Sequence, residues 1–526
     1  MLLGSARDTR APGRRAGGRT LIVAATAIGG LLCCYRVTGR SLGFDEGATA
    51  AIVAQHGAAL GHAIARDGGN MSGYYVLLHL LTGVFGDGPL VLRLPSVIAV
   101  AATTGCVSAL ASRLFDVRVA LATAALSAVS LPLVFWGQAA RGYAPMVAFV
   151  TASFLAFVVL VDRDARGQSI SRAWIVYLLC TVLAIYCSFV AVLALPAQVI
   201  SLARRRRPLA PVAAALATGA ICCVPLVVLA LRRGNGQLFW VPRLNLTGTL
   251  QVLEALTSSG LQPSFPLTAT SIAALCATLV LLLGALPATG SRWRRARRAR
   301  VAVDSDPRRA WAATLIGGWL VVPIMLAVLE SLVGQSIFLP RNLLMCLPPV
   351  AMIVASVLLD PRLPSAVGWG GVAALLALRA LQLAPSYGVS PEDWRVASAY
   401  VTAATRAGDC IAFYPADGRM AFAYYHGSGR PAPQPVLPPA PWTEVKPYVE
   451  DYDTLSAAEL TRLPSRCERL WFVFSHEGQR AGPPVSRSNY ARFVALQNGL
   501  DAEFEPLATR SFGYAAPVGV QLLERR

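Results

Sequence analysis

Long apolar segments recur along the first 384 residues and are separated by short polar connections. A membrane-spanning helix needs roughly twenty predominantly apolar residues, and eleven segments approach that length. They lie at 21–38, 94–111, 119–137, 144–161, 173–187, 188–203, 208–231, 267–287, 311–333, 343–359 and 366–384. We therefore expect a mainly α-helical, polytopic membrane domain over residues 1–384, with about eleven transmembrane helices.

The pattern changes from residue 385 onward, where short apolar segments alternate with helix-like ones. Such alternation of strands and helices is typical of α/β domains. We therefore predict a small soluble α/β domain over residues 385–526. The expected strands are Cys410–Tyr414 and Leu470–Phe474, and the expected helices run from the segment Pro391–Trp394 to Ala407 and from Thr454 to Leu463.

Two cysteines lie in this second domain, Cys410 and Cys467, each at the start of an expected strand. In an oxidising compartment the two could form a disulfide, and two free thiols are the alternative. The other nine cysteines fall in the apolar segments, where cysteine is an ordinary small hydrophobic residue.

Composition and charge support a membrane location and argue against a nucleic-acid partner. The 526 residues are 55% hydrophobic and only 14% charged, whereas soluble domains carry about a quarter charged residues. The formal net charge is +19, but residues 385–526 hold 15 acidic and 14 basic side chains. The basic excess therefore sits in short runs between apolar segments, as orientation signals do.

The basic runs also predict the orientation of the chain. The first apolar segment follows five arginines and precedes no small-residue cleavage site, so we interpret it as a signal anchor. If the N-terminus is cytoplasmic, the inner connections include the runs Arg204–Arg207 and Arg292–Arg300, which satisfies the positive-inside rule. An odd number of spans then places the C-terminal domain outside the inner (plasma) membrane.

The first external loop, about residues 39–93, contains two adjacent carboxylates, Asp45 and Glu46. A carboxylate in a partly dry site can act as a general base toward an acceptor hydroxyl. The alternative is a helix N-terminus, where acidic side chains favour the helix dipole.

The same loop carries further polar and aromatic residues: Asp67, Asn70, Tyr74 and Tyr75. The two tyrosines beside an apolar stretch fit either an interfacial aromatic belt or a platform for a sugar ring. His56 and His62 are six residues apart, which is a weak metal signal, so we expect no metal site.

Two short external connections contain arginine, against the general charge bias. Arg141 and Tyr143 follow the third apolar segment, and Arg341 lies between the ninth and tenth. Guanidinium groups bind phosphate through paired donors, so Arg141 and Arg341 are candidates for holding a phosphate group.

Two absences bear on transport. Apart from Glu330, the apolar segments contain almost no acidic residues, whereas ion-coupled transporters usually carry ionisable groups within their spans. The sequence also contains no GxxxxGK[ST] phosphate-binding loop. Chemistry at the outer membrane face therefore explains the sequence better than transport does.

These features occur in a recognisable order over residues 20–360. They are Asp45-Glu46, Tyr74-Tyr75-Val76-Leu77-Leu78-His79, Leu92-Arg93-Leu94-Pro95-Ser96, Ala140-Arg141-Gly142-Tyr143 and Arg341-Asn342-Leu343-Leu344. Together they resemble the GT-C glycosyltransferases, and more closely the bacterial relatives of protein O-mannosyltransferases and of the aminoarabinose transferase of lipid A. Where many relatives have a proline-rich segment, this chain has Asn70-Met71-Ser72-Gly73.

The resemblance implies an inverting transfer of a sugar from a polyprenyl-phosphate donor at the outer face, without a cofactor. By this resemblance Asp45 would be the base, Glu46 would shape the site or contact the acceptor, and Arg141 and Arg341 would hold the donor phosphate. The acceptor would be a glycan, a lipid or a protein, with membrane lipids as surroundings. A lipid or glycan transporter and a non-catalytic cell-envelope scaffold are the alternatives.

Overall fold

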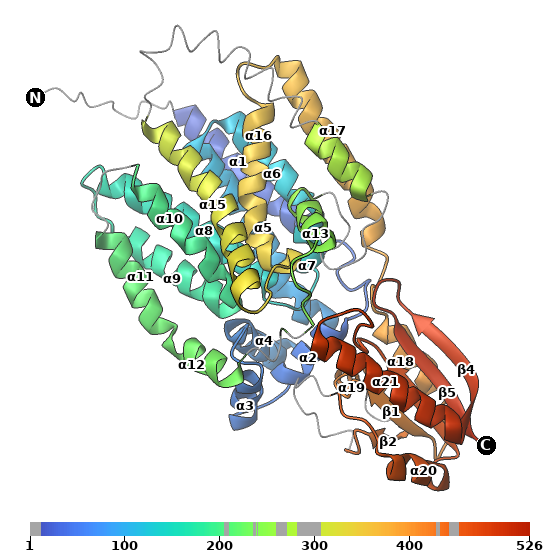
Figure 1. The fold of residues 1–526 in the computed structure, drawn as a ribbon. Helices are drawn as coiled ribbons and strands as arrows, with labels where there is room; N and C mark the ends of the chain where they lie inside the picture. The colour runs from blue at the N-terminus through green and yellow to red at the C-terminus, as the bar shows by residue number, and fades with distance from the viewer. Residues whose placement is uncertain are drawn as a thin grey trace, which may run out of the picture.

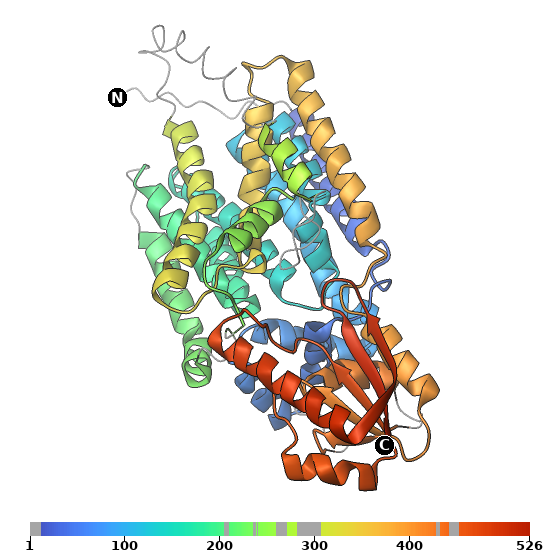
Figure 2. The ribbon, with the colours of Figure 1, turned by 45° about the vertical axis from the view of Figure 1, so that its right-hand side comes forward.

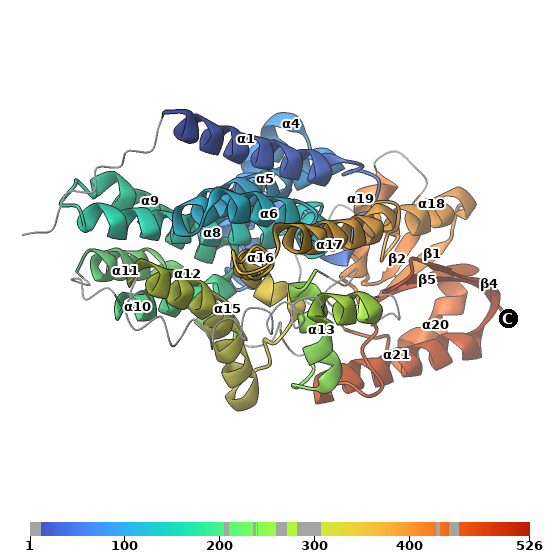
Figure 3. The same cartoon turned by 90° about the horizontal axis from the view of Figure 1, so that it is seen from above.

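The computed structural model describes residues 12–204, 210–234, 238, 240–258, 271–280, 307–427, 432–440 and 452–526. Helices dominate the chain as far as residue 386, and all five strands of the described residues come after it. The three views agree that the strands lie at one end of the helical bundle (Figures 1, 2 and 3).

The helical bundle is formed by elements that are mostly apolar on several faces. They are α1 (Pro12–Cys34), α5 (Pro89–Leu114), α6 (Val117–Ala128), α7 (Leu131–Gly137), α8 (Tyr143–Asp164), α9 (Ser171–Cys187), η1 (Phe189–Ala194), α10 (Leu195–Leu202), α11 (Ala210–Cys222), α12 (Val224–Arg233), α13 (Leu246–Leu256), α15 (Pro307–Val333), η3 (Pro340–Cys346), α16 (Leu347–Leu358) and α17 (Ser365–Ser386). Helices α5 and α8 are central, because α5 packs against α1, α6 and α8, while α8 also packs against α9.

Each of the eleven apolar segments overlaps a described helix or two consecutive ones, and the segment 267–287 does so through the helical residues Ser271–Val280. Within the described residues, five helices are long and apolar enough to cross a membrane. Two bent pairs, α6–α7 and α11–α12, raise this number to seven if each pair forms one span. The chain is therefore a mostly helical, multi-pass membrane protein, and the number of eleven crossings stays a prediction. The Arg292–Arg300 run lies outside the described residues.

The expected first external loop contains three short helices: α2 (Phe44–Val53), α3 (Ala58–Arg66) and α4 (Ser72–Phe85). They lie at the end of the bundle that faces the strands (Figure 1). Helix α2 packs against α4 on one side and against α19 (Gly418–His426) on the other. This loop is thus a folded layer between the bundle and the C-terminal residues.

The C-terminal residues form a five-stranded mixed sheet in the order β2-β1-β3-β5-β4. Its strands are β1 (Cys410–Tyr414), β2 (Gln434–Leu437), β3 (Arg469–Phe474), β4 (Phe504–Phe512) and β5 (Val518–Arg525). Strand β1 pairs in parallel with β2 and β3, whereas β5 pairs antiparallel with β3 and β4. The helices with it are α18 (Trp394–Ala404), α19, α20 (Ala457–Arg466) and α21 (Pro484–Glu503).

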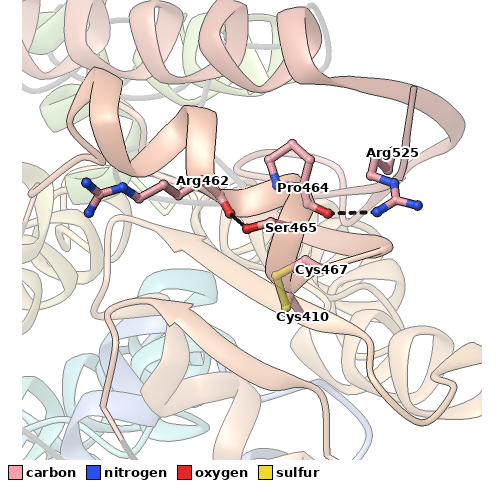
Figure 4. Close-up of a disulfide and its surroundings, with 6 residues drawn as sticks. All are labelled: Cys410, Arg462, Pro464, Ser465, Cys467 and Arg525. Atoms are coloured by element: carbon pink, nitrogen blue, oxygen red, sulfur yellow. Dashed lines mark hydrogen bonds between the residues drawn. A yellow bond between two sulfur atoms is a disulfide. The ribbon is translucent and has the colours of Figure 1, made fainter.

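The expected strand Cys410–Tyr414 coincides with β1, and Leu470–Phe474 lies within β3. The small sheet with helices at the C-terminus is therefore confirmed, while the domain boundary at residue 385 stays a prediction. Cys410 and Cys467 form a disulfide, with their Cα atoms 5.7 Å apart. Figure 4 shows it beside the end of α20, where the Arg525 side chain donates a hydrogen bond to the Pro464 carbonyl.

The C-terminal residues are docked onto the segment that leads into α2. The backbone N–H of Ser41 donates to the Ser390 hydroxyl (2.9 Å), and the N–H of Leu42 donates to the Tyr425 hydroxyl (2.6 Å). The N–H of Phe44 donates to the Glu392 carboxylate. Three of the four backbone N–H groups of residues 41–44 therefore donate to side chains from the far end of the sequence.

Candidate active site

A cavity of about 360 Å³ lies where the helical bundle, the α2 segment and the C-terminal residues meet. Its lining includes three residues that the sequence singles out together: Asp45, Arg141 and Arg341. They come from the first turn of α2, the α7–α8 connection and the start of η3. Residues almost 300 positions apart thus meet around one cavity.

Asp45 forms ion pairs with both arginines. Its Oδ2 atom lies 3.2 Å from the Arg341 guanidinium and 3.9 Å from Nε of Arg141. The Asp45 side chain remains 30% exposed. It is therefore reachable from the cavity while it faces two positive charges.

The charges around Asp45 set its protonation. Burial would raise the pKa of this carboxyl, but the Arg141 and Arg341 charges outweigh burial and hold the pKa below its usual range. Without a bound substrate, Asp45 is therefore a carboxylate that neutralises two cations.

Arg341 lies against aromatic rings. Its guanidinium carbon is 4.7 Å from the centre of the Trp240 ring and 5.7 Å from that of Tyr143. Tyr143 in turn packs edge-to-face on Trp136, with ring centres 4.6 Å apart. Planar guanidinium groups stack well on such faces, so these rings restrict where the Arg341 charge can point.

Arg141 is largely buried and contacts the loop helices α2 and α4. One terminal nitrogen donates to the Asp45 carbonyl, the Thr49 hydroxyl and the Tyr75 hydroxyl, at 3.3–3.4 Å. The Tyr75 hydroxyl donates to Asp67 at 3.0 Å. A buried chain from Asp67 through Tyr75 therefore fixes the position of Arg141.

Glu46 belongs to an internal ion pair. Its two carboxylate oxygens each accept a 2.8 Å hydrogen bond from the guanidinium of Arg93, and Oε1 also accepts one from the backbone N–H of Ala140. Arg93 is fully buried and donates its remaining hydrogens to the carbonyls of residues 37, 40 and 41. All of these Arg93 partners lie inside the protein, so the side chain does not extend to the membrane surface.

The remaining predicted residues lie behind the cavity. Tyr74 is buried, with its hydroxyl 3.0 Å from that of Ser96. Asn70 accepts a hydrogen bond from the backbone N–H of Phe189 at 3.3 Å. Neither tyrosine of the Tyr74-Tyr75 pair lines the cavity, so the structure places this pair in the packing of the loop layer.

Comparison with known proteins agrees with this architecture. A family model described as dolichyl-phosphate-mannose-protein mannosyltransferase matches residues 73–230. The crystal structure of ArnT from Cupriavidus metallidurans in the apo state superimposes with a TM-score of 0.54 at 14% identity, covering 97% of this chain and 98% of that one. The chain has a GT-C glycosyltransferase fold. The resemblance that the sequence indicates is thereby confirmed.

Two further GT-C structures are similar. ArnT from the same organism bound to undecaprenyl phosphate gives a TM-score of 0.52 at 14% identity, covering 96% of this chain and 98% of that one. The archaeal oligosaccharyltransferase AglB from Archaeoglobus fulgidus, in complex with an inhibitory peptide and a dolichol-phosphate, gives 0.53 at 12% identity, covering 97% and 74%. No curated protein matches the chain.

The sequence analysis missed the part of this cavity that comes from the C-terminal residues. Glu392 and His476 both line the cavity, and His476 Nε2 lies 3.5 Å from Glu392 Oε1. Glu392 was overlooked because it lies in a segment that the sequence predicts as the start of a helix. His476 follows directly after the expected strand Leu470–Phe474, and the carboxyl end of a strand in an α/β sheet is a usual position for ligand contacts.

Proposed function

We propose that this chain is a polyprenyl-phosphate-dependent glycosyltransferase of the mannosyltransferase-like kind. The observation that carries the proposal is the pairing of Asp45 with Arg141 and Arg341 at the cavity of a GT-C fold. The undecaprenyl phosphate and dolichol-phosphate named with the similar structures support a polyprenyl carrier. The reaction would take place at the outer face of the inner membrane.

The proposed donor joins its sugar to a lipid through an anomeric phosphodiester, which is negatively charged. Arg141 and Arg341 provide the two fixed cations of the cavity that face Asp45. A phosphate placed between them would replace the Asp45 carboxylate as their partner. Preorganised cations of this kind stabilise the charge that grows on a leaving phosphate.

The same exchange would prepare Asp45 for proton transfer. Once the donor phosphate neutralises the two arginines, the effect that lowers the Asp45 pKa weakens while the effect of burial remains. The carboxylate then becomes a better base at the moment when the donor is in place. Donor binding and base activation are therefore coupled through the arginines.

In the proposed single displacement, Asp45 takes the proton of the acceptor hydroxyl and the hydroxyl oxygen bonds to the anomeric carbon. The bond between that carbon and the phosphate oxygen breaks, and its electron pair leaves with the polyprenyl phosphate. Because the nucleophile arrives opposite the leaving group, the configuration at the anomeric carbon is inverted.

The test compares purified wild type with Asp45→Asn, using labelled sugar on polyprenyl phosphate. Loss of a general base lowers turnover by about 10²- to 10⁴-fold, so we expect that loss with the carrier still bound. Asp87→Asn is the matched control, because Asp87 is exposed in the same external loop. Equal transfer by wild type and Asp45→Asn contradicts the proposal.

A further inference from the structure

The two sides of the cavity differ in charge. The side formed by the bundle and α2 carries Arg40, Arg141 and Arg341 with the paired carboxylates of Asp45 and Glu46. The side formed by the C-terminal residues carries the carboxylates Glu392 and Asp417 and, among its described lining residues, neither lysine nor arginine. The anionic donor has its partners on the first side, so the second side needs a different ligand.

The second side is built on the ends of two parallel strands. Strands β1 and β3 run parallel. Pro415 and Asp417 lie within three residues of the end of β1, and His476 and Gly478 lie within four residues of the end of β3. All four of these residues line the cavity. In open α/β sheets, ligands bind in the crevice beyond the carboxyl ends of the parallel strands. The sheet therefore presents its usual ligand-binding edge to the site.

Glu392 connects this edge to the helix that carries Asp45. Its Oε2 atom accepts hydrogen bonds from the backbone N–H of Phe44, the first residue of α2, and from the Trp394 indole at 3.2 Å. Its other oxygen faces His476. Burial raises the pKa of the Glu392 carboxyl, and the nearby Asp45 charge adds to this shift.

His476 lies over the same first turn of α2. Its ring centre is 4.7 Å from that of Phe44, and its Nδ1 lies 3.1 Å from the Ser475 hydroxyl. Its backbone has φ = 53°, a left-handed conformation that is uncommon for residues other than glycine. The hydroxyl of Tyr452 donates to the His476 carbonyl at 3.1 Å and holds this turn. Unfavourable backbone geometry of this kind gathers at functional sites.

We propose that this side of the cavity is the acceptor subsite, that its ligand is an uncharged glycan, and that the Glu392–His476 pair holds the reacting hydroxyl beside Asp45. Carboxylates, an imidazole and the side chains of Tyr452, Gln479 and Ser486 offer donors and acceptors for sugar hydroxyls. Among its described lining residues this side has no lysine or arginine to pair with a phosphate or carboxylate, which disfavours phosphorylated or acidic acceptors. The inference rests on the proposed function, because it needs a donor on the arginine side.

The first experiment identifies the acceptor class. Purified full-length protein and labelled polyprenyl-phosphate sugar are added to membranes from cells in which the gene is deleted, and the labelled product is separated by anion exchange and protease treatment. We expect a neutral, protease-resistant product. A product that is anionic or attached to protein overturns the inference and leaves the proposed function intact. The absence of any labelled product contradicts the proposed function, and the inference falls with it.

The second experiment tests the pair itself with the acceptor found in the first. We expect Glu392→Gln and His476→Phe to raise the KM for the acceptor roughly tenfold or more, since each loses hydrogen bonds to the acceptor hydroxyl. His476→Phe keeps the ring contact with Phe44, and binding of undecaprenyl phosphate should not change in either variant. Glu505→Gln and His56→Phe, both at exposed positions, are the matched controls. If the acceptor KM of these variants equals that of the controls, or if the variants no longer bind undecaprenyl phosphate, the assignment of Glu392 and His476 to the acceptor subsite is overturned.

Discussion

Asp45 and the proposed donor phosphate compete for the same two cations. The carboxylate Oδ2 is within 4 Å of nitrogens from both Arg141 and Arg341. Each arginine is also held from behind, Arg141 by the Tyr75 hydroxyl and Arg341 by the Trp240 ring. The guanidinium groups can therefore change partner without moving far, which is the condition for tight coupling between donor binding and base activation.

The charge of Arg341 should be visible in the pH dependence of the reaction. In the wild type the Asp45 pKa is below its usual value of about 3.9. We therefore expect kcat/KM to decrease only at low pH, where Asp45 becomes protonated; this decrease is the acid limb of the pH–rate profile. Arg341→Gln removes one of the two charges that lower this pKa, so the Asp45 pKa rises and the acid limb moves to higher pH. The same variant should bind undecaprenyl phosphate at least roughly tenfold more weakly.

A pH–rate profile and a carrier-binding titration check both effects. Arg243→Gln is the control, because Arg243 is an exposed arginine between α12 and α13 that does not line the cavity. An acid limb that stays in place would show that Asp45 is not the titrating group.

The Glu46–Arg93 pair should matter for stability. Glu46→Gln removes the negative partner of a fully buried arginine, and breaking a buried ion pair costs about 3–5 kcal/mol. Arg93 lowers the Glu46 pKa despite burial, so the stabilisation is fully present above the usual glutamate pKa of about 4.3 and is lost progressively as the pH falls from there through the lower pKa of the folded state. Thermal unfolding in detergent at pH 7, and then at decreasing pH well below that value, measures both. Equal stability of the variant and the wild type at pH 7 would contradict this account.

At this scale the sequence predicted the residues whose chemistry is unusual for their position. Arg141 and Arg341 stand out because arginine is rare in external connections, and both reach the cavity. Tyr74 and Tyr75 do not, because their burial depends on how the loop layer packs, and no local pattern encodes that packing. Glu392 and His476 were missed for the same reason, since only the tertiary fold brings them to Phe44.

Helix α2 is the element on which the site depends, and its fit is close on both sides. A Cβ atom on Gly47 would lie 2.6 Å from the Ala421 Cα atom of α19. Real Cβ atoms essentially never approach that closely, so glycine at this position allows α2 and α19 to touch. The α2 helix is therefore tightly packed between the bundle and the C-terminal residues.

Gly47→Ala should therefore displace α19 from α2 and reduce transfer strongly, while the membrane bundle stays folded. Limited proteolysis of the C-terminal residues and an activity assay report the two effects. Gly61→Ala is the matched control in α3, because a Cβ atom there meets no atom within 4 Å. If Gly47→Ala leaves both activity and protease resistance unchanged, the close contact has no role in the site.

The disulfide joins the first strand of the sheet to the end of α20 and closes a separation of 57 residues. The chain-entropy effect of a loop of this size is about 4 kcal/mol, and measured values are usually about 2–4 kcal/mol. We expect Cys410→Ser with Cys467→Ser to lower the unfolding temperature of the C-terminal residues, and reduction of the wild type to do the same. Cys34→Ser, at an exposed position on α1, should have no such effect. Indifference of the wild type to reductant would argue against the bond.

Elements were predicted well where local pattern decides them. The apolar segments coincide with helices because lipid demands length and hydrophobicity together, and β1 and β3 coincide with apolar runs between turns. Strands β4 and β5 were not expected. Their sequences alternate less clearly, and β4 is mostly exposed, so pairing in the sheet and not a local pattern makes them strands.

At the scale of the whole molecule, the arginine-rich connections predict the orientation of the chain in the membrane. We expect a cytoplasmic N-terminus and an external C-terminus, because the arginine-rich connections then face the cytoplasm. Reporter fusions placed after Arg526 and in the connection 165–170 should report outside and inside, respectively. The disulfide agrees with an external position, since such bonds persist in oxidising compartments. A cytoplasmic signal from the Arg526 fusion would reverse the topology.

The contact between the α2 segment and the C-terminal residues also fixes an order of events during biosynthesis. Three of the groups that hold the helix of Asp45, namely those of Ser390, Glu392 and Tyr425, are synthesised more than 340 residues after it. A chain that ends before these residues would therefore carry the arginines and the apolar bundle while Asp45, the proposed base, lacks the contacts that position its helix. Such a product could bind lipid carrier without using it, so the proposed activity requires synthesis of the chain at least as far as Tyr425.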